Sequence, residues 1–565
     1  MKRTSKVLAI LLALAMVVTM MAACGTPSGG GDGGGSTDGG EDSGEVVVRA
    51  VLTADPSSLD PGFGNSSDST SPRGIMYEGL VRIYDNVLSP ALAESWECGE
   101  DGVTWTFHLR DSKWSDGQPV TAYDFEYGFK RLMSQEEDAP KGNYQWIGEA
   151  IYNGYEVESG QVPADELGVK AIDDKTLEVK SAGVMPYFVD ILKTPVFYPV
   201  REDIVAQVGN EYGSSPEKSI SCGPFTLTEW EHESKLVFEK NPGYWNADNI
   251  NVDKLEIYII QDSATIMNMF DNNELDMMPS ITKNFIQKYI DTGEAIQMDG
   301  ATIQYIAVNT KTEREASPLL QNKNFRQALS YVINREDIVT AARGDGSKAV
   351  SRLLPTNITT AYNNEFMGDT YPYEPYPLTG DVEKAKELFA KALEETGLTA
   401  DTLPTLTLVT YDEDPAKKIA EVVQDNCATE FGLKVEIDTQ TYGARQEKEH
   451  AGDYDLCVTN WAPDYNDPIN FLECYASTNS YNTYFGGLQN AEVDQLVAAI
   501  KANNDFKSRA DDMFKCEQII CEELPVIPLW QTAGYWAMKP YVTGITKCGF
   551  GANDPDYAQV HYIGE

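Results

Sequence analysis

"LTLVTYDED" (406–414) and "LKVEIDTQTY" (433–442) are two runs rich in apolar and β-branched residues, and a helical pattern lies between them near 415–431. Two such runs on either side of one helix predict a strand–helix–strand unit. Alternation of strands and helices is typical of α/β folds, so the chain is expected to contain an α/β domain.

Strand patterns also occur well before this unit. "GVTWTFHLR" (102–110) alternates strictly between apolar and polar residues from Val103 onward, which predicts a half-buried strand. "VVVRAVLT" (46–53) predicts a strand that opens the fold, and "LGVKAIDDKTLEVKS" (167–181) predicts a hairpin that turns at Asp173-Asp174. The chain therefore mixes strands and helices from its first globular residues onward.

Helix signals fall between these strands. Thr121 is followed three residues later by Asp124, a spacing that predicts a helix beginning at Thr121 as the N-cap. The apolar residues of 324–342 fall at helical spacing and predict one amphipathic helix. "PVIPLWQ" (525–531) predicts a late strand.

The amino-terminal residues predict export rather than fold. Lys2, Arg3 and Lys6 flank an apolar run at 7–21, and "MAAC" places small residues before Cys24. This pattern is typical of a secretory signal peptide, and the run is short for a spanning helix, which needs about 20 residues. The Cys also resembles the lipobox of bacterial lipoproteins, which implies cleavage before Cys24 and a diacylglycerol on its sulfur. The alternative is an uncleaved anchor helix with an incidental Cys.

Residues 24–45 are expected to be a flexible tether. The stretch "CGTPSGGGDGGGSTDGGEDSG" (24–44) is almost entirely Gly, Ser, Thr and acid, with nothing that builds a core. We therefore expect a signal peptide at 1–23, a tether at 24–45, and a globular part that works beside a membrane on its outer side.

Length, charge and cysteine content limit what the remaining chain can be. About 520 residues exceed one ordinary domain, so two or three domains are expected. The formal net charge of −44 repels phosphate backbones, so nucleic acid is not an expected partner. There are nine Cys, and no C-x-x-C pair is among them. Beyond Cys24, buried free thiols are expected for most of them, although spacing alone leaves disulfides open.

Motifs of catalysis and metal binding are missing from the sequence. The four His show no tight metal spacing, and neither G-x-S-x-G nor a P-loop occurs. Several Asp cluster at 453–467, but they do not form an EF-hand pattern. No catalytic residue, metal or cofactor is therefore predicted. Nine Trp and thirty Tyr suit a ligand cleft, because these side chains combine contact area with a polar group.

Several stretches, in this order, resemble one family. "LAESWECGEDGVTWTFHLRDSKWSDGQPVTAYDF" (92–125) is similar to the family-5 extracellular solute-binding proteins, the class that includes oligopeptide- and dipeptide-binding proteins of ABC importers. The same resemblance continues through "YEGL" (77–80), "LGVKAIDDKTLEV" (167–179), "CGPFTLTEW" (222–230), "NPGYW" (241–245), "FRQALSYVINREDIV" (325–339) and "YDLCVTNWAPDYNDP" (454–468).

The resemblance implies an α/β, two-lobed, periplasmic-binding-protein-like fold of type II, in the large peptide-binder class with an extra inserted subdomain. The implied boundaries are 46–90, 213–305 and 530–565 for lobe I, 91–212 for its inserted subdomain, and 306–529 for lobe II. The chain would cross between lobes near 305 and near 530. It also implies a monomer that closes around a peptide and delivers it to an ABC permease and its ATPases, from a lipid anchor on the extracytoplasmic face of the cell membrane.

The resemblance further implies a ligand site. Asp464, the acid of the W-x-x-D-Y segment, would pair with a peptide α-ammonium group, since a carboxylate accepts charge-assisted hydrogen bonds. Peptide main chain would pair with backbone at 460–462 and near Ser71–Pro72, as an added strand. The expected ligand-binding residues are Asp464, Trp461, Asn460, Ala462, Tyr442, Tyr144, Trp530 and Ser71. For Tyr144 the alignment also admits Lys141.

The sequence departs from some relatives at the carboxyl end of the ligand. Where they place basic side chains, this chain has Val458, Glu449 and Ala416, and Arg343 and Arg445 are the nearest substitutes. A Cys pair beside the ligand is replaced by residues near Ala301 and by Ala462. Peptide length is therefore left open. The same fold binding an oligosaccharide, an opine or a metal chelate is the alternative reading, and a secreted hydrolase is a third.

Overall fold

The protein is described by a computed structural model, which covers residues 44–63, 67–84, 87–135, 139–140, 145–359, 367–503, 505–547 and 555–564. The predicted signal peptide, nearly all of the predicted tether, and with them Cys24, lie outside the described residues, as do Tyr144 and Lys141. Contacts join Glu45–Glu565 into one unit.

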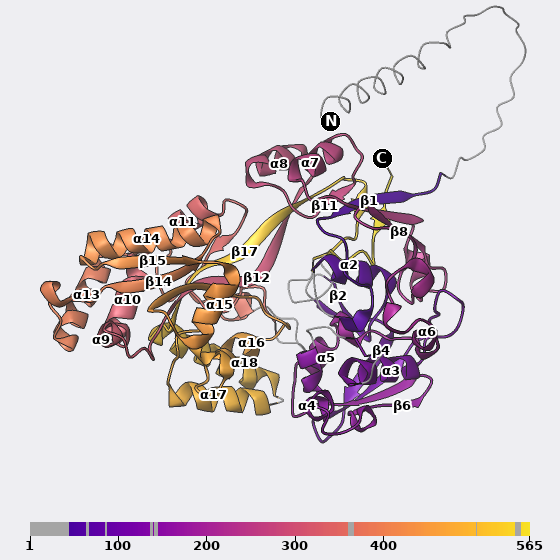
Figure 1. The fold of residues 1–565 in the computed structure, drawn as a ribbon, viewed down its shortest axis with the longest axis horizontal. Helices are drawn as coiled ribbons and strands as arrows, with labels where there is room; N and C mark the ends of the chain where they lie inside the picture. Colours follow the sequence, from indigo (N-terminus) through magenta and orange to yellow (C-terminus); the bar gives the residue numbers. More distant parts are fainter. Residues whose placement is uncertain are drawn as a thin grey trace, which may run out of the picture. The chain divides into compact units, whose positions relative to one another are not determined.

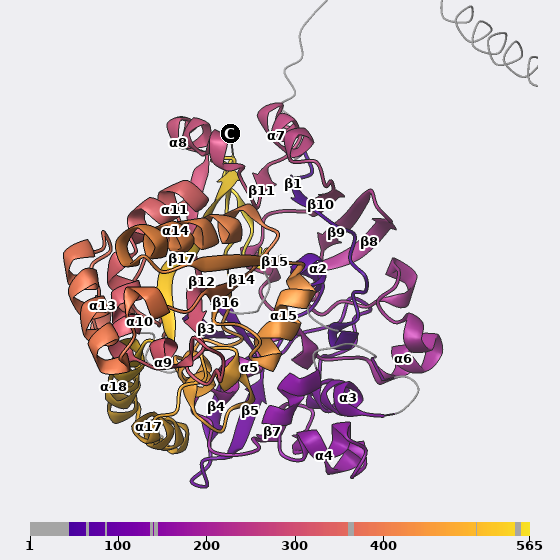
Figure 2. The same ribbon diagram turned by 60° about the vertical axis from the view of Figure 1, so that its left-hand side comes forward.

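A mixed sheet forms the centre of the later half of the chain (Figures 1 and 2). Its strand order is β11-β17-β12-β16-β14-β15, and β13 also pairs with β17. The strands are β11 (Met277–Met278), β12 (Ala295–Val308), β13 (Lys348–Ala349), β14 (Leu406–Tyr411), β15 (Val435–Gln440), β16 (Leu456–Trp461) and β17 (Val526–Met538).

The predicted strand–helix–strand unit is confirmed. β14 and β15 pair in parallel, and α14 (Asp414–Phe431) connects them. Gly432 caps the carboxyl end of this helix, and its φ of 63° is a left-handed conformation that glycine adopts without penalty. β16 then returns beside β14, and its outer end carries the residues that the sequence marks for ligand binding.

β12 and β17 pair antiparallel over most of their length, and each contributes to more than one hydrophobic core. Ala537 packs with the apolar side chains around α7 (Ser263–Asp271) and α8 (Ile286–Thr292). Ile306 and Ile527 instead pack with the helices that flank the central sheet. The expected crossings near 305 and 530 fall inside these two strands; the domain boundaries themselves stay a prediction.

Two further sheets lie in the first half of the chain. One has the order β1-β10-β9-β8 and the other β4-β5-β7-β6. Their strands are β1 (Val47–Leu52), β4 (Ala93–Cys98), β5 (Thr104–Leu109), β6 (Val169–Asp173), β7 (Thr176–Lys180), β8 (Phe225–Glu231), β9 (Lys235–Lys240) and β10 (Lys254–Ile259). The predicted strands at 46–53 and 102–110 and the hairpin at 167–181 are confirmed.

The short pairs β2 (Val81–Tyr84) with β3 (Val87–Pro90) and β18 (Val542–Thr543) with β19 (His561–Tyr562) complete the strands. The longer helices are α2 (Ser67–Met76), α3 (Ala122–Met133), α10 (Lys323–Val332), α11 (Arg335–Ala342), α13 (Val382–Thr396), α15 (Tyr442–Ala451), α17 (Ala491–Ala502) and α18 (Phe506–Glu523). Shorter ones are α4 (Gly154–Glu158), α5 (Phe188–Ile191), α6 (Glu202–Val208), α9 (Ser317–Leu320), α12 (Met367–Thr370) and α16 (Ile469–Leu472).

Helix starts follow side-chain caps. Thr121 begins α3 as predicted: its backbone N–H donates to Asp124 Oδ2 at 2.8 Å, which closes a capping box. The single helix predicted over 324–342 is wrong, because α10 ends at Val332 and α11 begins after Asn334. Asn334 Oδ1 accepts the Asp337 N–H at 3.1 Å, so an internal N-cap starts a second helix.

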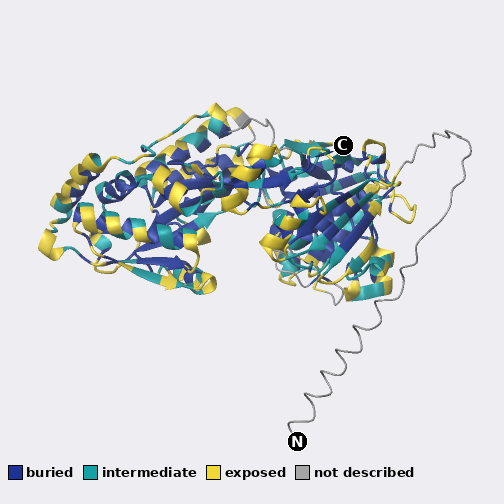
Figure 3. Cartoon of the chain, turned by 90° about the horizontal axis from the view of Figure 1, so that it is seen from above, coloured by how far each residue is buried: buried dark blue, intermediate teal, exposed yellow. Residues whose placement is uncertain are grey.

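Burial follows the expected layers, with dark-blue strands inside and exposed helix faces outside (Figure 3). No helix in the described part of the chain is long and apolar enough to cross a membrane. Within the same described ranges, no group of three or more His, Cys, Asp or Glu side chains could hold a metal ion.

A buried ionic cluster ties the carboxyl-terminal segment to the first part of the chain. Arg82 donates to Asp556 at 2.6 and 2.7 Å and to Glu78 Oε2 at 2.8 Å. The three side chains are at most 3% exposed. Burial raises the pKa of Glu78, while Arg82 and the Tyr244 hydroxyl act against that rise. The guanidinium is therefore what keeps two buried carboxylates compensated.

Replacing Arg82 alone should lower the free energy of unfolding severely. Arg82→Met leaves two carboxylates buried without a cation, a change that typically costs about 3–5 kcal/mol. Urea unfolding at neutral pH measures the loss. A carboxyl whose folded-state pKa lies above its unfolded value stabilises the protein at low pH and loses that contribution as pH rises. The deficit of Arg82→Met should therefore shrink as pH falls. Lys391→Met, at a solvent-exposed ion pair with Glu387, is the matched control; an equal loss there would contradict the assignment.

Candidate functional site

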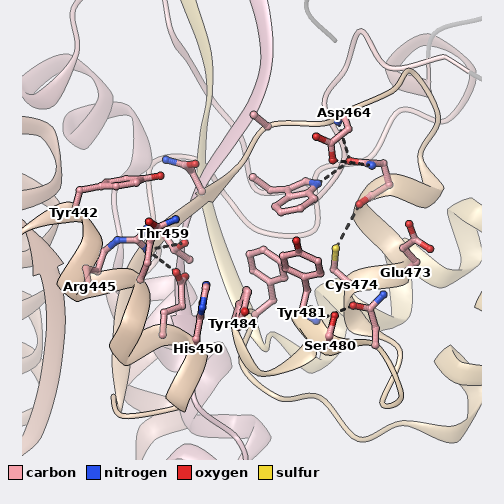
Figure 4. A pocket seen from close by; sticks show the side chains of 18 of the residues that line it. Tyr442, Arg445, His450, Thr459, Asp464, Glu473, Cys474, Ser480, Tyr481 and Tyr484 are labelled. Carbon is pink, nitrogen blue, oxygen red and sulfur yellow. Dashed lines mark hydrogen bonds and ion pairs between the residues drawn. The ribbon is translucent and has the colours of Figure 1, made fainter. Parts of the chain in front are cut away.

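A cavity of about 710 Å³ opens beside the outer end of β16 (Figure 4). One wall is a single face of α15 and another is the segment around the turn at 479–485. It is lined by Tyr442, Arg445, Gln446, Glu449, His450, Thr459, Asn460, Trp461, Ala462, Asp464, Tyr465, Asn470, Glu473, Cys474, Asn479, Ser480, Tyr481, Tyr484 and Phe485. Five of the eight predicted ligand residues are thus brought together: Asp464, Trp461, Asn460, Ala462 and Tyr442.

The end of β16 has a strand partner on one side only. β12 pairs with it along its whole length, from Leu456 to Trp461. β14 pairs with it only at Leu456 and Cys457, and no other strand among the described residues continues that edge. The cavity is lined by Thr459, Asn460 and Trp461 from this part of the strand. Backbone groups of an unpaired strand edge are suited to pairing with an added extended chain.

Asn470, which the sequence did not single out, organises the acid and the aromatic. Its Oδ1 accepts the Trp461 Nε1–H at 2.8 Å and the Asp464 backbone N–H at 3.3 Å. Its Nδ2 also lies 3.5 Å from Asp464 Oδ2. Asn470 is only 4% exposed, so one buried amide sets the relative position of Trp461 and Asp464.

Arg445 and Glu449 form a buried ion pair on the α15 wall. Arg445 Nη1 donates to Glu449 Oε2 at 2.8 Å and to Thr459 Oγ1 at 3.2 Å, and each side chain is 5% exposed. Burial raises the pKa of Glu449, and the Arg445 charge opposes that rise. The spacing of four residues on a helix places the two side chains on one face. Their charges cancel locally, so neither contributes a free charge to the cavity.

Aromatic rings form much of the second wall and meet α15 at His450. Trp461 meets Tyr481 and Phe485 edge to face, with ring centroids 5.4 and 5.5 Å apart. His450 stacks on Tyr484 with centroids 3.9 Å apart. Apart from Trp461, these residues were missed because Tyr and Phe spread through the chain carry no local signal of a shared cavity.

Three predicted ligand residues are not part of this cavity. Trp530 is 1% exposed and packs in the core beside the central sheet. Ser71 is 1% exposed and donates to the Pro555 carbonyl at 2.6 Å. Ser71 and Pro72 both lie inside α2, not in an extended segment. Because backbone groups in a helix bond mainly within the helix, the predicted strand-like pairing with a peptide is not supported at this position. Tyr144 lies outside the described residues.

The two arginines considered for the ligand's carboxyl end are separated. Arg445 lines the main cavity, whereas Arg343 lines a different cavity of about 300 Å³ and pairs with Asp345 at 2.6 Å. Both guanidinium groups already have a carboxylate partner.

Cys474 lies in the cavity wall, and its Sγ is 3.5 Å from the Asn470 carbonyl. Burial raises its pKa well above the ordinary value, and the nearby Glu473 and Asp464 charges raise it further. The described cysteines are all free thiols, and only Cys98 among them is exposed. The expectation of buried thiols is thereby confirmed for the described cysteines other than Cys98.

Thiol labelling should reflect this burial. In protein lacking residues 1–44, iodoacetamide at mildly alkaline pH should modify the exposed Cys98 first and the buried Cys474 only after unfolding, because alkylation needs an accessible thiolate. Peptide mapping by mass spectrometry locates the label, and Cys98→Ser supplies the background. Labelling of Cys474 in the native protein as fast as Cys98 would contradict the buried, protonated state.

Known proteins share this architecture. The family model described as bacterial extracellular solute-binding proteins, family 5 Middle, matches residues 87–483. The dipeptide-binding protein DppE of Bacillus subtilis (strain 168) is 30% identical over 510 residues, covering 89% of this chain and 90% of DppE. The unliganded open form of the periplasmic murein tripeptide-binding protein MppA superposes with a TM-score of 0.77 at 26% identity, covering 92% of this chain and 97% of MppA. Listeria monocytogenes OppA bound to peptide has a TM-score of 0.67 at 26% identity, covering 93% and 100%.

Proposed function

Because the chain belongs to family 5 of the bacterial extracellular solute-binding proteins, we propose that it captures peptides with a free amino terminus and delivers them to an ABC transporter. DppE is a dipeptide-binding protein, and the Listeria structure holds a peptide. Proteins of this family bind solutes rather than convert them. Capture and release without chemical change is therefore the function we assign to this chain.

The observation that carries the proposal is the one-sided pairing of β16 beside an acid. Thr459–Trp461 line the cavity and pair with β12 but not with β14, and Asp464 lies three residues beyond the strand end. An extended peptide that adds to such an edge gains main-chain hydrogen bonds whatever its side chains are. A carboxylate at the end of that edge then selects the end of the peptide that carries an ammonium group.

The charge of the cavity agrees with this orientation. Its Arg445 is compensated by Glu449, and its Glu473 pairs with Lys501 at 2.7 Å. Asp464 also lines the cavity, is partly exposed, and has the Asn470 side-chain amide 3.5 Å from its Oδ2. A cationic group is therefore favoured near Asp464. Among the described residues that line the cavity, Arg445 is the only Lys or Arg and it is paired with Glu449, so we assign no fixed anchor to the peptide's other end.

Acetylation of the peptide amine should weaken binding strongly. Removing one partner of a buried, hydrogen-bonded charge pair typically costs about 2–5 kcal/mol. Isothermal titration calorimetry with a short peptide and its N-acetyl form should show this difference for the unchanged protein. Asp464→Asn should lose most of it.

Asp453→Asn is the matched control, since Asp453 is an exposed acid on the same approach to β16, paired with Arg314. It should retain the preference for the free amine. Equal affinity of the unchanged protein for free and acetylated peptides would remove Asp464 from the proposed role.

We also propose that the mature protein is a monomer held at the outer face of the cell membrane by a lipid on Cys24, with 24–45 as its tether. The sequence around Cys24 supports this assignment. A tether of this composition behaves as a random coil, spanning roughly 25 Å for twenty residues. That length lets the globular part reach a permease in the same membrane.

Replacing the lipidated residue should release the protein. Cys24→Ser expressed in a host that processes lipoproteins should move the protein from the membrane fraction to the soluble or secreted fraction. Immunoblots of the separated fractions measure the shift. Cys98→Ser, which removes a different accessible thiol, should stay with the membrane. Membrane association of Cys24→Ser would contradict lipid anchoring.

A further inference from the structure

The segment that follows Asp464 is held by residues from a distant part of the chain. Tyr465, Asn466 and Asp467 are each at most 6% exposed. Two of them contact the region around α5 (Phe188–Ile191), which belongs to the predicted inserted subdomain 91–212. Figure 1 shows α5 on the side of its sheet that faces α16. The residue proposed to bind the ligand amine is therefore attached to a segment with anchors outside its own sheet.

The first anchor is an aromatic stack. The rings of Tyr187 and Tyr465 are parallel within 2°, with centroids 4.6 Å apart. The Tyr465 hydroxyl also donates to Glu473 Oε1 at 3.0 Å. Tyr187 is 4% exposed, so the stack is enclosed on both sides. It restricts the position of the residue directly after Asp464.

The second anchor is a hydrogen bond to a buried carboxylate. The Asn466 backbone N–H donates to Asp190 Oδ2 at 3.0 Å. Lys193 compensates Asp190 with contacts of 2.6 and 2.9 Å, and both side chains are 1% exposed. A buried carboxylate with its own cation is a fixed acceptor, because moving it would separate the pair. The Asn466 side chain also accepts the Thr359 N–H at 2.8 Å.

The third anchor is the Asp467–Arg509 pair on the far side of the segment. Arg509 donates to both Asp467 oxygens at 2.6 and 2.9 Å, and both side chains are 0% exposed. The guanidinium carbon of Arg509 lies 5.7 Å from the Tyr187 ring centroid. Asp467 in turn accepts, through its backbone carbonyl, the N–H of Asn470, the amide that bonds to Trp461 and Asp464. The anchors thus lead directly to the ligand site.

We infer that Tyr187 and Asp190 are positioning residues for ligand recognition: they hold the segment 465–467 so that Asp464 keeps the place needed to pair with a peptide amine. This inference rests on the proposed function. It assigns to the predicted subdomain 91–212 a part in setting the preference for a free amino terminus, although none of the residues that the structure describes in this range lines the cavity.

Asp464 must be correctly oriented to pair with a peptide amine. A charge-assisted hydrogen bond depends on the distance and angle between its partners. Asp464 follows Pro463 in a loop; Asn470 contacts it directly, and the anchors on 465–467 restrict the backbone that carries it. Loss of the stack would let the carboxylate sample other positions. That loss weakens the amine contact selectively and leaves the contacts along β16 in place.

The test measures discrimination between a free peptide and its N-acetyl form. The discrimination ratio is the Kd of the acetylated peptide divided by the Kd of the free peptide. Tyr187→Leu should lower this ratio by about threefold to tenfold, the range that one aromatic pair contributes. The affinity for the acetylated peptide should barely change. Tyr187→Phe keeps the ring and should retain the ratio of the unchanged protein. If Tyr187→Leu does not fold, the double variant Asp190→Leu with Lys193→Met removes the second anchor without leaving a lone buried charge, and a lowered ratio is again expected.

A matched control separates positioning from general destabilisation. Phe129→Leu disrupts the buried contact of Phe129 with Phe197 in the same subdomain and should lower the melting temperature without changing the ratio. An unchanged ratio in Tyr187→Leu, or equal weakening of both peptides, would overturn the inference. If the unchanged protein does not discriminate between the peptides at all, the proposed function fails first, and that result is visible before any variant is measured.

Discussion

The structure depends on the pairing of β12 with β17 on one edge and with β16 on the other. These ladders place Gln304 between Trp530 and Asn460, and they extend the same two strands from one hydrophobic core to the next. The cavity lies beside β16 where this strand extends beyond its pairing with β14. Over Thr459–Trp461 only β12 is paired with β16. A strand end with an open edge is a liability in most proteins, and here it lines a cavity of about 710 Å³.

Charge is the second constraint. The chain carries a formal charge of −44, yet its buried carboxylates have specific cations, as in Arg82 with Asp556 and Arg509 with Asp467. Ion pairs of this kind fix geometry more than they add stability, since desolvation offsets much of the attraction. Their placement is informative. Arg82 ties the end of the chain to its beginning, and Arg509 holds the segment that carries Asp464.

Much of the local structure could be predicted from residue patterns. The unit at β14, α14 and β15, the strand β5 and the capped start of α3 follow from periodicity and short-range hydrogen bonding, which act within a few residues. The error at 324–342 also has a local cause, because apolar spacing continued through Asn334 while its side chain capped a new helix. Of the ligand residues that the family resemblance implies, Asp464, Trp461, Asn460, Ala462 and Tyr442 line one cavity, whereas Trp530 is buried in the core and Ser71 lies in α2.

What the sequence by itself determined is the class of fold, the order of its elements, the acidic surface, and the segment W-x-x-D-Y as the place to look for a ligand. These properties depend on composition and on neighbours along the chain. Only the tertiary structure decided that Asn470 joins Trp461 to Asp464, that Glu449 cancels Arg445, and that Tyr187 and Asp190 meet the segment 465–467. Those contacts join residues whose separation ranges from a few positions to 278 in the case of the Tyr187–Tyr465 stack. No periodicity encodes such pairings, because they are set by the packing of whole elements on one another.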